Sequence, residues 1–217
     1  RARAEVGNDF VLAGTDSYLH PEETYFNCLH EHGMDGTRAD DISRAAISLR
    51  RKMWGNLEVL RRHVPGCERV SLIASAAAMG VRETRRFRCG YTLTIDDVLT
   101  GRTFDDQVYR YACFVDIHEP KAGAKSEHAD LYPPPGQSYG VPYRCLVPDG
   151  IEHLLVAGRC LSATHEALAS VRMMPSCMAM GQAAGTAAAL ALKSGCTPRA
   201  LPVAALRAQL AADGVNL

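Results

Sequence analysis

The chain has 217 residues, which is long enough for one sizeable hydrophobic core or for two small ones. Its 24 lysines and arginines equal its 24 aspartates and glutamates, so the charge pattern gives no footprint for nucleic acid or for an anionic membrane surface. No apolar run reaches the ~18 residues of a membrane span, and the first residues do not read as a signal peptide. We therefore expect a globular, cytoplasmic protein without nucleic-acid or membrane partners.

A long amphipathic helix is the clearest element in the first half of the chain. Thr37 is a suitable N-cap, and Pro65-Gly66 ends the pattern. The apolar residues between these ends recur at helical spacing: Ile42, Ala45, Leu49, Met53, Leu57, Leu60 and Val64. The basic residues of the same segment, Arg50 to Lys52 and Arg61-Arg62, are expected on its solvated face.

Four β-rich runs and one short helix are predicted in the sequence before and after this long helix. Thr94 caps the short helix, Asp97 completes an approximate capping box, and Gly101 closes the helix. The proline-rich stretch from Glu119 to Gly140 reads as a loop. The β-rich runs are Phe10 to Ala13, Val70 to Ala74, Phe87 to Leu93 and Tyr109 to Val115.

The most informative segment runs from Ile151 to Leu192. Its apolar residues Leu154 to Val156 predict a strand buried on both faces, which Ala157-Gly158 ends. A polar loop from Arg159 to Arg172 follows, and Pro175 suits the first turn of a helix. A helix N-terminus close to a ligand favours negative charge. Small residues leave one face of this helix open to a backbone or a flat ring: Gly181, Ala183, Ala184, Gly185, Ala187 and Ala188.

This segment resembles the C-terminal flavin-binding segment of FAD-dependent oxidoreductases of the glutathione-reductase-like fold, in the group of flavoproteins similar to the flavin-containing subunit of heterodisulfide reductase. Two further segments resemble signatures of the same family in the same order: Met79 to Gly101, MGVRETRRFRCGYTLTIDDVLTG, and Tyr139 to Pro148, YGVPYRCLVP. Together they cover most of the chain from about Asp35 onward. The resemblance implies an α/β fold and FAD as the cofactor. It also implies transfer of a hydride or electron pair between an organic small-molecule substrate and the flavin.

The glycine turn that opens such a fold is absent from the sequence. A strand, a G-x-G-x-x-G turn and a helix would hold the FAD pyrophosphate, and no such triplet follows a strand near the start of the chain. We expect a partial two-domain fold that lacks the N-terminal dinucleotide-binding βαβ unit, so that the missing half is a partner of this chain. Residues 1–138 would belong to the substrate-side domain, and residues 139–217 would form the C-terminal segment of the FAD-binding domain. A natural short protein is the alternative.

The resemblance also implies roles for individual residues. His165 would donate a proton, Arg172 would hold an anion over the flavin ring, and Arg82 would fix a substrate carboxylate or phosphate. A merely structural role in capping and satisfying the backbone is the alternative for His165 and Arg172. Tyr143 and Arg144 are weaker candidates. The residues expected to line the flavin come from the turn and the last helix: Gly158, Arg159, Pro175, Met180, Gly181, Gln182 and Gly185.

The eight cysteines are scattered without a C-x-x-C pair, so the sequence spells out no zinc ribbon and no iron–sulfur ligand set. Cys28, His30 and His32 alternate in a predicted loop without further ligands, and we expect no metal site. Two other classes stay open, namely a cofactor-free interaction or structural module derived from a flavoprotein, and a thiol-redox or metal enzyme. A bound flavin would exclude the first class, and well-separated sulfur atoms would exclude the second.

Overall fold

The computed structural model describes residues 15–17, 22–27, 29–117, 127 and 130–217. The chain divides into two compact units, Arg1–Val81 and Arg82–Leu217. The division predicted at residue 138 concerns the domains of a complete flavoprotein and stays a prediction. No helix in the described ranges combines the length and the apolar character needed to cross a membrane.

The described part of the first unit contains two short paired strands and one long helix. Strand β1 (Thr15–Ser17) pairs antiparallel with strand β2 (Thr24–Phe26), and helix α2 spans Ala39–His63. The predicted helix is therefore confirmed, and Ala45, Leu57 and Leu60 of its apolar stripe are buried. These three residues lie on the helix face that the 3.6-residue period of the apolar residues predicted to be buried.

The start of α2 differs from the prediction by one residue. Arg38 is the N-cap and makes no side-chain capping bond, whereas Thr37 lies in the preceding turn. The Thr37 N–H and hydroxyl both donate to Asp35 Oδ1, at 2.8 and 2.7 Å. Because Asp35 already holds Thr37 in an Asx turn, the threonine hydroxyl is not available to cap the helix.

The strand predicted at Val70 to Ala74 does not form. This run has no regular secondary structure, and Ile73 is one of the most exposed large apolar residues of the described chain. The β-rich composition was a poor guide here because β propensity measures fit to a half-buried sheet surface, and no neighbouring strand pairs with this run. The strand predicted at Phe10 to Ala13 lies outside the described residues.

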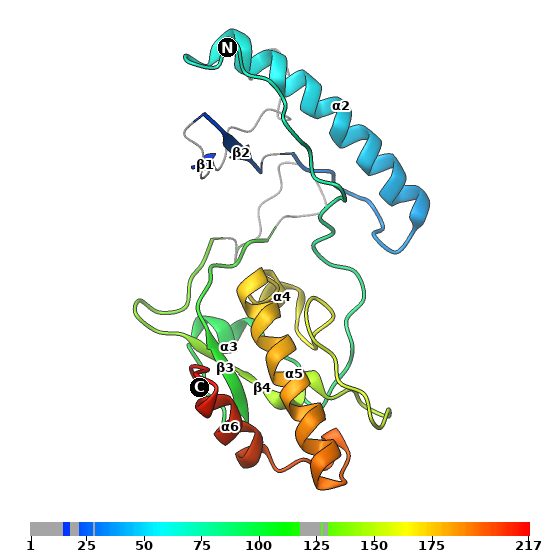
Figure 1. Cartoon of the computed structure of the whole chain (residues 1–217), viewed down its shortest axis with the longest axis vertical. Helices are drawn as coiled ribbons and strands as arrows, with labels where there is room; N and C mark the ends of the chain where they lie inside the picture. The colour runs from blue at the N-terminus through cyan, green and yellow to red at the C-terminus, as the bar shows by residue number, and fades with distance from the viewer. Residues whose placement is uncertain (1–14, 18–21, 28, 118–126, 128–129) are drawn as a thin grey trace. The chain divides into compact units, whose positions relative to one another are not determined.

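The second unit is built around a two-stranded antiparallel sheet that helices cover (Figure 1). Strands β3 (Gln107–Tyr111) and β4 (Tyr139–Pro142) pair with an irregularity between Gln107 and Tyr109. Helices α5 (Met174–Ser194) and α6 (Val203–Ala212) both pack on β3 and on each other. The remaining elements are short: α3 (Ile95–Leu99), η2 (Tyr143–Leu146), α4 (His165–Val171) and η3 (Pro198–Ala200).

The predicted cap of α3 is confirmed. The Asp97 N–H donates to the Thr94 hydroxyl at 3.3 Å, and the Thr94 N–H donates to Asp97 Oδ2 at 2.9 Å. These two bonds complete the capping box that the sequence predicted. Gly101 follows the helix with a φ of +64°, a left-handed conformation that glycine adopts without strain.

Helix α5 uses its small residues to approach the core closely. Pro175 lies in its first turn as predicted, and Gly195 ends it in the left-handed conformation. Its inward residues recur at helical spacing and are all buried: Ser176, Met180, Ala183, Ala187 and Ala191. The helix therefore contributes mostly backbone and short side chains to the core of the second unit.

Three buried tyrosine hydroxyls tie the sheet and η2 to the surrounding helices. The Tyr109 and Ser176 hydroxyl oxygens lie 2.8 Å apart, as do those of Tyr139 and Ser170. The Tyr143 hydroxyl donates to the Pro198 carbonyl at 2.9 Å. Burial raises the pKa of Tyr109 and of Tyr139 above that of a free phenol, so both stay protonated and able to donate.

Two predicted strands of this unit form only in part. Phe87 to Leu93 contributes isolated bridges at Cys89 and Leu93, and the strand predicted to run from Tyr109 to Val115 ends at Tyr111. The structure brings no continuous partner alongside these runs, so their apolar residues pack without forming a ladder.

The segment from Leu154 to Val156 was predicted wrongly as a buried strand. The Val156 N–H donates to the Leu146 carbonyl at 2.9 Å, but no strand pairs with the segment in the described ranges. The loop predicted from Arg159 to Arg172 instead contains α4. Its N-cap Thr164 accepts a hydrogen bond from the Ala167 N–H at 3.3 Å, and this cap was overlooked in the sequence.

Gly140→Ala is expected to lower the free energy of unfolding by about 1–3 kcal/mol. An added Cβ atom would lie 2.9 Å from Gln107 Cδ and 3.1 Å from Gln107 Cβ. Gln107 is buried, and its Oε1 accepts a hydrogen bond from the Phe104 N–H at 3.0 Å, so the side chain has little freedom to move. Urea unfolding measures the change.

The control is Gly185→Ala. No atom lies within 4 Å of a Cβ atom added at this exposed helical position, so stability should be unchanged or should rise by up to about 1 kcal/mol. Equal losses in the two variants would contradict this account of the Gly140 contact.

Candidate functional site

The three residues predicted as catalytic lie in two neighbouring groups of ion-paired side chains in the second unit, Arg82–Asp116–Arg172 and Arg86–Glu83–His165. We call the two groups together the charged cluster. Its members come from the segment before α3, from the segment after β3 and from α4: Arg82, Glu83, Arg86, Asp116, His165 and Arg172. The structure therefore joins residues that are up to 90 positions apart in the sequence.

Asp116 joins the two arginines that were predicted to hold an anion. Its Oδ2 atom lies 2.5 Å from Arg82 Nη1 and 3.0 Å from Arg172 Nη2. Arg172 Nη2 also donates to the Asp116 carbonyl at 2.7 Å. The Arg172 side chain is only 11% exposed, and its burial lowers the pKa of its guanidinium, as does the nearby charge of Arg82. Asp116 therefore stabilises two guanidinium groups that would otherwise repel each other.

Sequence reasoning missed Asp116. It directly follows the apolar end of the run Tyr109 to Val115, where a carboxylate can leave the core without being buried. Its segment is also tied to α4, because the Ser170 hydroxyl donates to the Cys113 carbonyl at 2.8 Å. The position after an apolar run was the one available signal.

Glu83 and His165 form the other part of the charged cluster. His165 Nδ1 lies 2.5 Å from Glu83 Oε2, and Arg86 Nη1 lies 2.8 Å from Glu83 Oε1. His165 is the first residue of α4, directly after the Thr164 N-cap. Glu83 therefore pairs with both an arginine and the imidazole.

Helix α4 sets the spacing between the imidazole and the anion-holding arginine. His165 begins the helix and Arg172 is its C-cap, so the two residues are two helical turns apart, or about 10 Å along the axis. With a neutral imidazole, the three arginines outweigh the two carboxylates of the charged cluster by one positive charge. The arrangement favours an anion near a group that can exchange a proton.

The predicted flavin-lining residues divide between the core and the surface. Met180 is fully buried, and its sulfur accepts a hydrogen bond from the Gly158 N–H at 3.4 Å. Gly158 has a φ of +91°, and no atom lies within 4 Å of a Cβ atom added there. Arg159 is exposed, and its charge partly opposes the burial that raises the pKa of Cys177.

The remaining flavin-lining candidates are exposed residues of α5. Gly181 and Gly185 are exposed, with no atom within 4 Å of an added Cβ atom, so the expected close approach to the glycine face does not occur within the described chain. Pro175 and Gln182 line a hollow of about 280 Å³ beside β3 and the segment Asp213 to Asn216. This volume lies just below the ~300–1,000 Å³ of typical ligand sites.

An apolar stripe runs along the outer side of α5. Its members recur at intervals of three and four residues: Met174, Met178, Gly181, Gly185, Ala188 and Leu192. Met174 is 80% exposed and Leu192 is 84% exposed. Such large, contiguous apolar exposure on a helix is typical of a surface that another molecule or domain covers.

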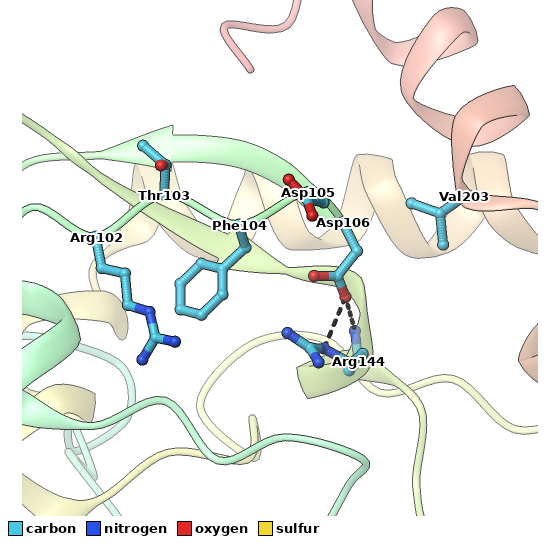
Figure 2. A pocket seen from close by; sticks show the side chains of 7 residues that line it. All are labelled: Arg102, Thr103, Phe104, Asp105, Asp106, Arg144 and Val203. Carbon is cyan, nitrogen blue, oxygen red and sulfur yellow. Dashed lines mark hydrogen bonds and ion pairs between the residues drawn. The ribbon is translucent and has the colours of Figure 1, made fainter.

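A larger hollow of about 470 Å³ lies on another part of the second unit, between the segment after α3 and the start of α6. Figure 2 shows Arg144 beside Asp106, with its Nε atom 3.0 Å from Asp106 Oδ2. The Arg144 guanidinium also stacks over the Tyr91 ring, 5.0 Å from its centroid, and Arg102 stacks over Phe104 at 4.9 Å. Of the residues singled out in the sequence, only the weaker candidate Arg144 lines this hollow.

The cysteines in the described ranges are all free thiols. Cys89 and Cys145 are buried, and burial raises the pKa of both, that of Cys89 to about 11. A thiol with a raised pKa is a poor nucleophile at neutral pH. No cluster of three or more potential metal-ligating side chains occurs among the residues that the structure describes, and Cys28 lies outside them.

Native-state alkylation should therefore spare Cys89 and Cys145 at pH 8. Because the pKa of Cys89 is raised to about 11, its thiol is protonated at pH 8 and becomes reactive only as the pH approaches that value. The half-buried Cys160 and Cys196 are the internal controls and should react first. Mass spectrometry of iodoacetamide adducts gives the order, and early labelling of Cys89 would contradict it.

One of three comparisons with known proteins supports the FAD-dependent oxidoreductase family that the sequence resembles. A search among curated proteins and among solved structures found no match. A family model described as FAD dependent oxidoreductase matches residues 3–210. This range contains every member of the charged cluster and every predicted flavin-lining residue. The chain therefore belongs to the FAD-dependent oxidoreductase family, whose cofactor is FAD.

Proposed function

We propose that this chain is the C-terminal portion of a two-domain flavoprotein, related to the flavin-containing component of heterodisulfide reductase, that oxidises or reduces an organic anion with FAD. Family membership supports the flavin chemistry. The observation that carries the substrate class is the charged cluster, in which Arg82 and Arg172 meet on Asp116. The excess of positive charge there supports an anionic substrate over a neutral one.

The surface around Gly158 and α5 is compatible with the flavin end of the cofactor. Gly158, Gly181 and Gly185 have no atom within 4 Å of an added Cβ atom, which leaves room for the close approach of a flat ring. The start of α5 offers backbone N–H groups and the positive end of its helix dipole. These features support binding of the flavin edge by Gly158, Pro175, Gly181 and Gly185.

The same surface provides nothing comparable for the pyrophosphate. The sequence contains no G-x-G-x-x-G turn. In flavoproteins of this fold, the backbone of that turn normally binds the two phosphates. The apolar stripe on α5 supports a role as the contact to the missing dinucleotide-binding half, because Met174, Met178 and Leu192 are left exposed.

Three residues of the charged cluster have distinct tasks in this proposal. Arg172 and Arg82 orient the substrate anion from either side of Asp116, and His165 exchanges a proton with the substrate. When bound, FAD accepts or returns the electron pair. Burial of Arg172 strengthens its attraction for an anion, because the surrounding protein screens charge less than water does.

A cofactor-free interaction module is the second candidate, and the apolar stripe is the observation that favours it. A surface of this kind would serve a protein partner as well as a flavin-binding half. The presence of flavin in the purified full gene product separates the two candidates, since a module would contain none.

The chain 1–217 alone is expected to lose FAD during gel filtration. The pyrophosphate is the most highly charged part of the cofactor, and the sequence lacks the glycine turn that would bind it. Absorbance near the flavin band in the protein peak gives the result. Stoichiometric, non-dissociating FAD would show that no further half is needed for binding.

Arg172→Lys in the full gene product should slow reduction of the flavin by substrate by more than about tenfold, which corresponds to about 1.4 kcal/mol of transition-state stabilisation. Lysine keeps the positive charge but lacks the planar guanidinium, which can donate hydrogen bonds to Asp116 and to a substrate anion at the same time. Stopped-flow absorbance follows the reduction, and the flavin content should remain that of the wild type.

The matched control is Arg88→Lys. Arg88 is 89% exposed, and its Nε atom lies 3.8 Å from Asp149 Oδ2, outside the charged cluster. Its reduction rate should equal that of the wild type. A wild-type rate in Arg172→Lys would remove this arginine from the substrate site.

A further inference from the structure

The contact between Glu83 and His165 determines which nitrogen of the imidazole carries the proton. An ionised carboxylate only accepts hydrogen bonds, so the hydrogen between His165 Nδ1 and Glu83 Oε2, 2.5 Å apart, belongs to the imidazole. Arg86 approaches the other oxygen of the same carboxylate at 2.8 Å. Glu83 therefore faces a hydrogen-bond donor at each of its two carboxylate oxygens.

The contact is held from both sides by the fold. His165 lies at the first position of α4, which the Thr164 cap fixes, and Glu83 is 82 residues away in the sequence, held by Arg86. Two such anchored partners keep the imidazole ring in one orientation more firmly than a bond between neighbours in a flexible loop.

The second imidazole nitrogen is left open. His165 Nε2 has no hydrogen-bond partner in the ranges that the structure describes, and the His165 side chain is 44% exposed. In a neutral imidazole that is protonated on Nδ1, Nε2 carries the lone pair. The accessible atom is then the one that can accept a proton.

We infer that Glu83 is a positioning residue, which fixes the proton of His165 on Nδ1 and leaves Nε2 as the proton-transfer atom of the site. The role given to Nε2 rests on the proposed function. A substrate that gives FAD an electron pair as hydride also loses a proton, and His165 Nε2 accepts that proton without any change at Glu83. The reverse reaction returns the proton from the same atom.

The tautomer of His165 provides a test that does not depend on activity. Long-range ¹H–¹⁵N NMR spectra of chain labelled with ¹⁵N-histidine distinguish Nδ1–H from Nε2–H, and His165→Gln assigns the signal among the eight histidines. At about pH 9, where an ordinary imidazole is neutral, the wild-type chain should show Nδ1–H as the main form of His165. A main Nε2–H form in the wild type would overturn the inference.

The variant Glu83→Ala should shift His165 towards Nε2–H, the form that free histidine favours. The control variant is Glu166→Ala, which removes a carboxylate from the residue next to His165 but takes away no partner of the imidazole. Its spectrum should match the wild type. An unchanged tautomer in Glu83→Ala, or an equal shift in Glu166→Ala, would contradict the role of Glu83.

A second readout uses the flavin-containing full gene product. Glu83→Ala should slow reduction of the flavin by substrate by about tenfold or more while the flavin content stays unchanged, and Glu166→Ala should not. A wild-type rate in Glu83→Ala would overturn the positioning role. Failure of the proposed function is distinguishable, since it would appear as absence of flavin from the wild-type protein.

Discussion

The close packing of α5 against β3 is the constraint on which the second unit depends. Ser176, Ala183 and Ala187 bring the helix backbone near the sheet, and larger side chains at these buried positions would push it away. The bond between the Ser176 and Tyr109 hydroxyls satisfies two polar groups that this approach removes from water. The small residues and the paired hydroxyls therefore depend on each other. Close approach leaves no room for water to hydrate the hydroxyls, so they hydrogen-bond to each other instead.

This packing also locates the charged cluster. Arg172 caps the end of α4, and α5 begins two residues later, so fixing α5 on the sheet limits where the arginine can lie. Asp116 reaches it from the segment that follows β3, the strand against which α5 packs. The charges of Arg172 and Asp116 therefore meet where α4 leads into α5 and where the chain leaves β3, and such support from packed elements is what a preorganised polar site requires.

The sequence predicted what is encoded locally. The capping box of Thr94 and Asp97, the apolar period of α2 and the first turn of α5 depend on residues a few positions apart, and all three are confirmed. The short strands depended on partners that composition does not reveal, so the run Leu154 to Val156 was predicted wrongly. The resemblance to the family singled out Arg82, His165 and Arg172, but Asp116 acquires its meaning only from the two distant arginines that it joins.

Helix α5 has two sides under separate demands. The inner side packs in the core. On the outer side, no atom lies within 4 Å of a Cβ atom added at Gly181 or Gly185. The described part of this unit therefore leaves room for an added Cβ atom at those two positions. If functional variants accept only small residues at Gly181 and Gly185, that restriction reports the shape of whatever the complete protein places against the helix. It does not report the stability of the fold.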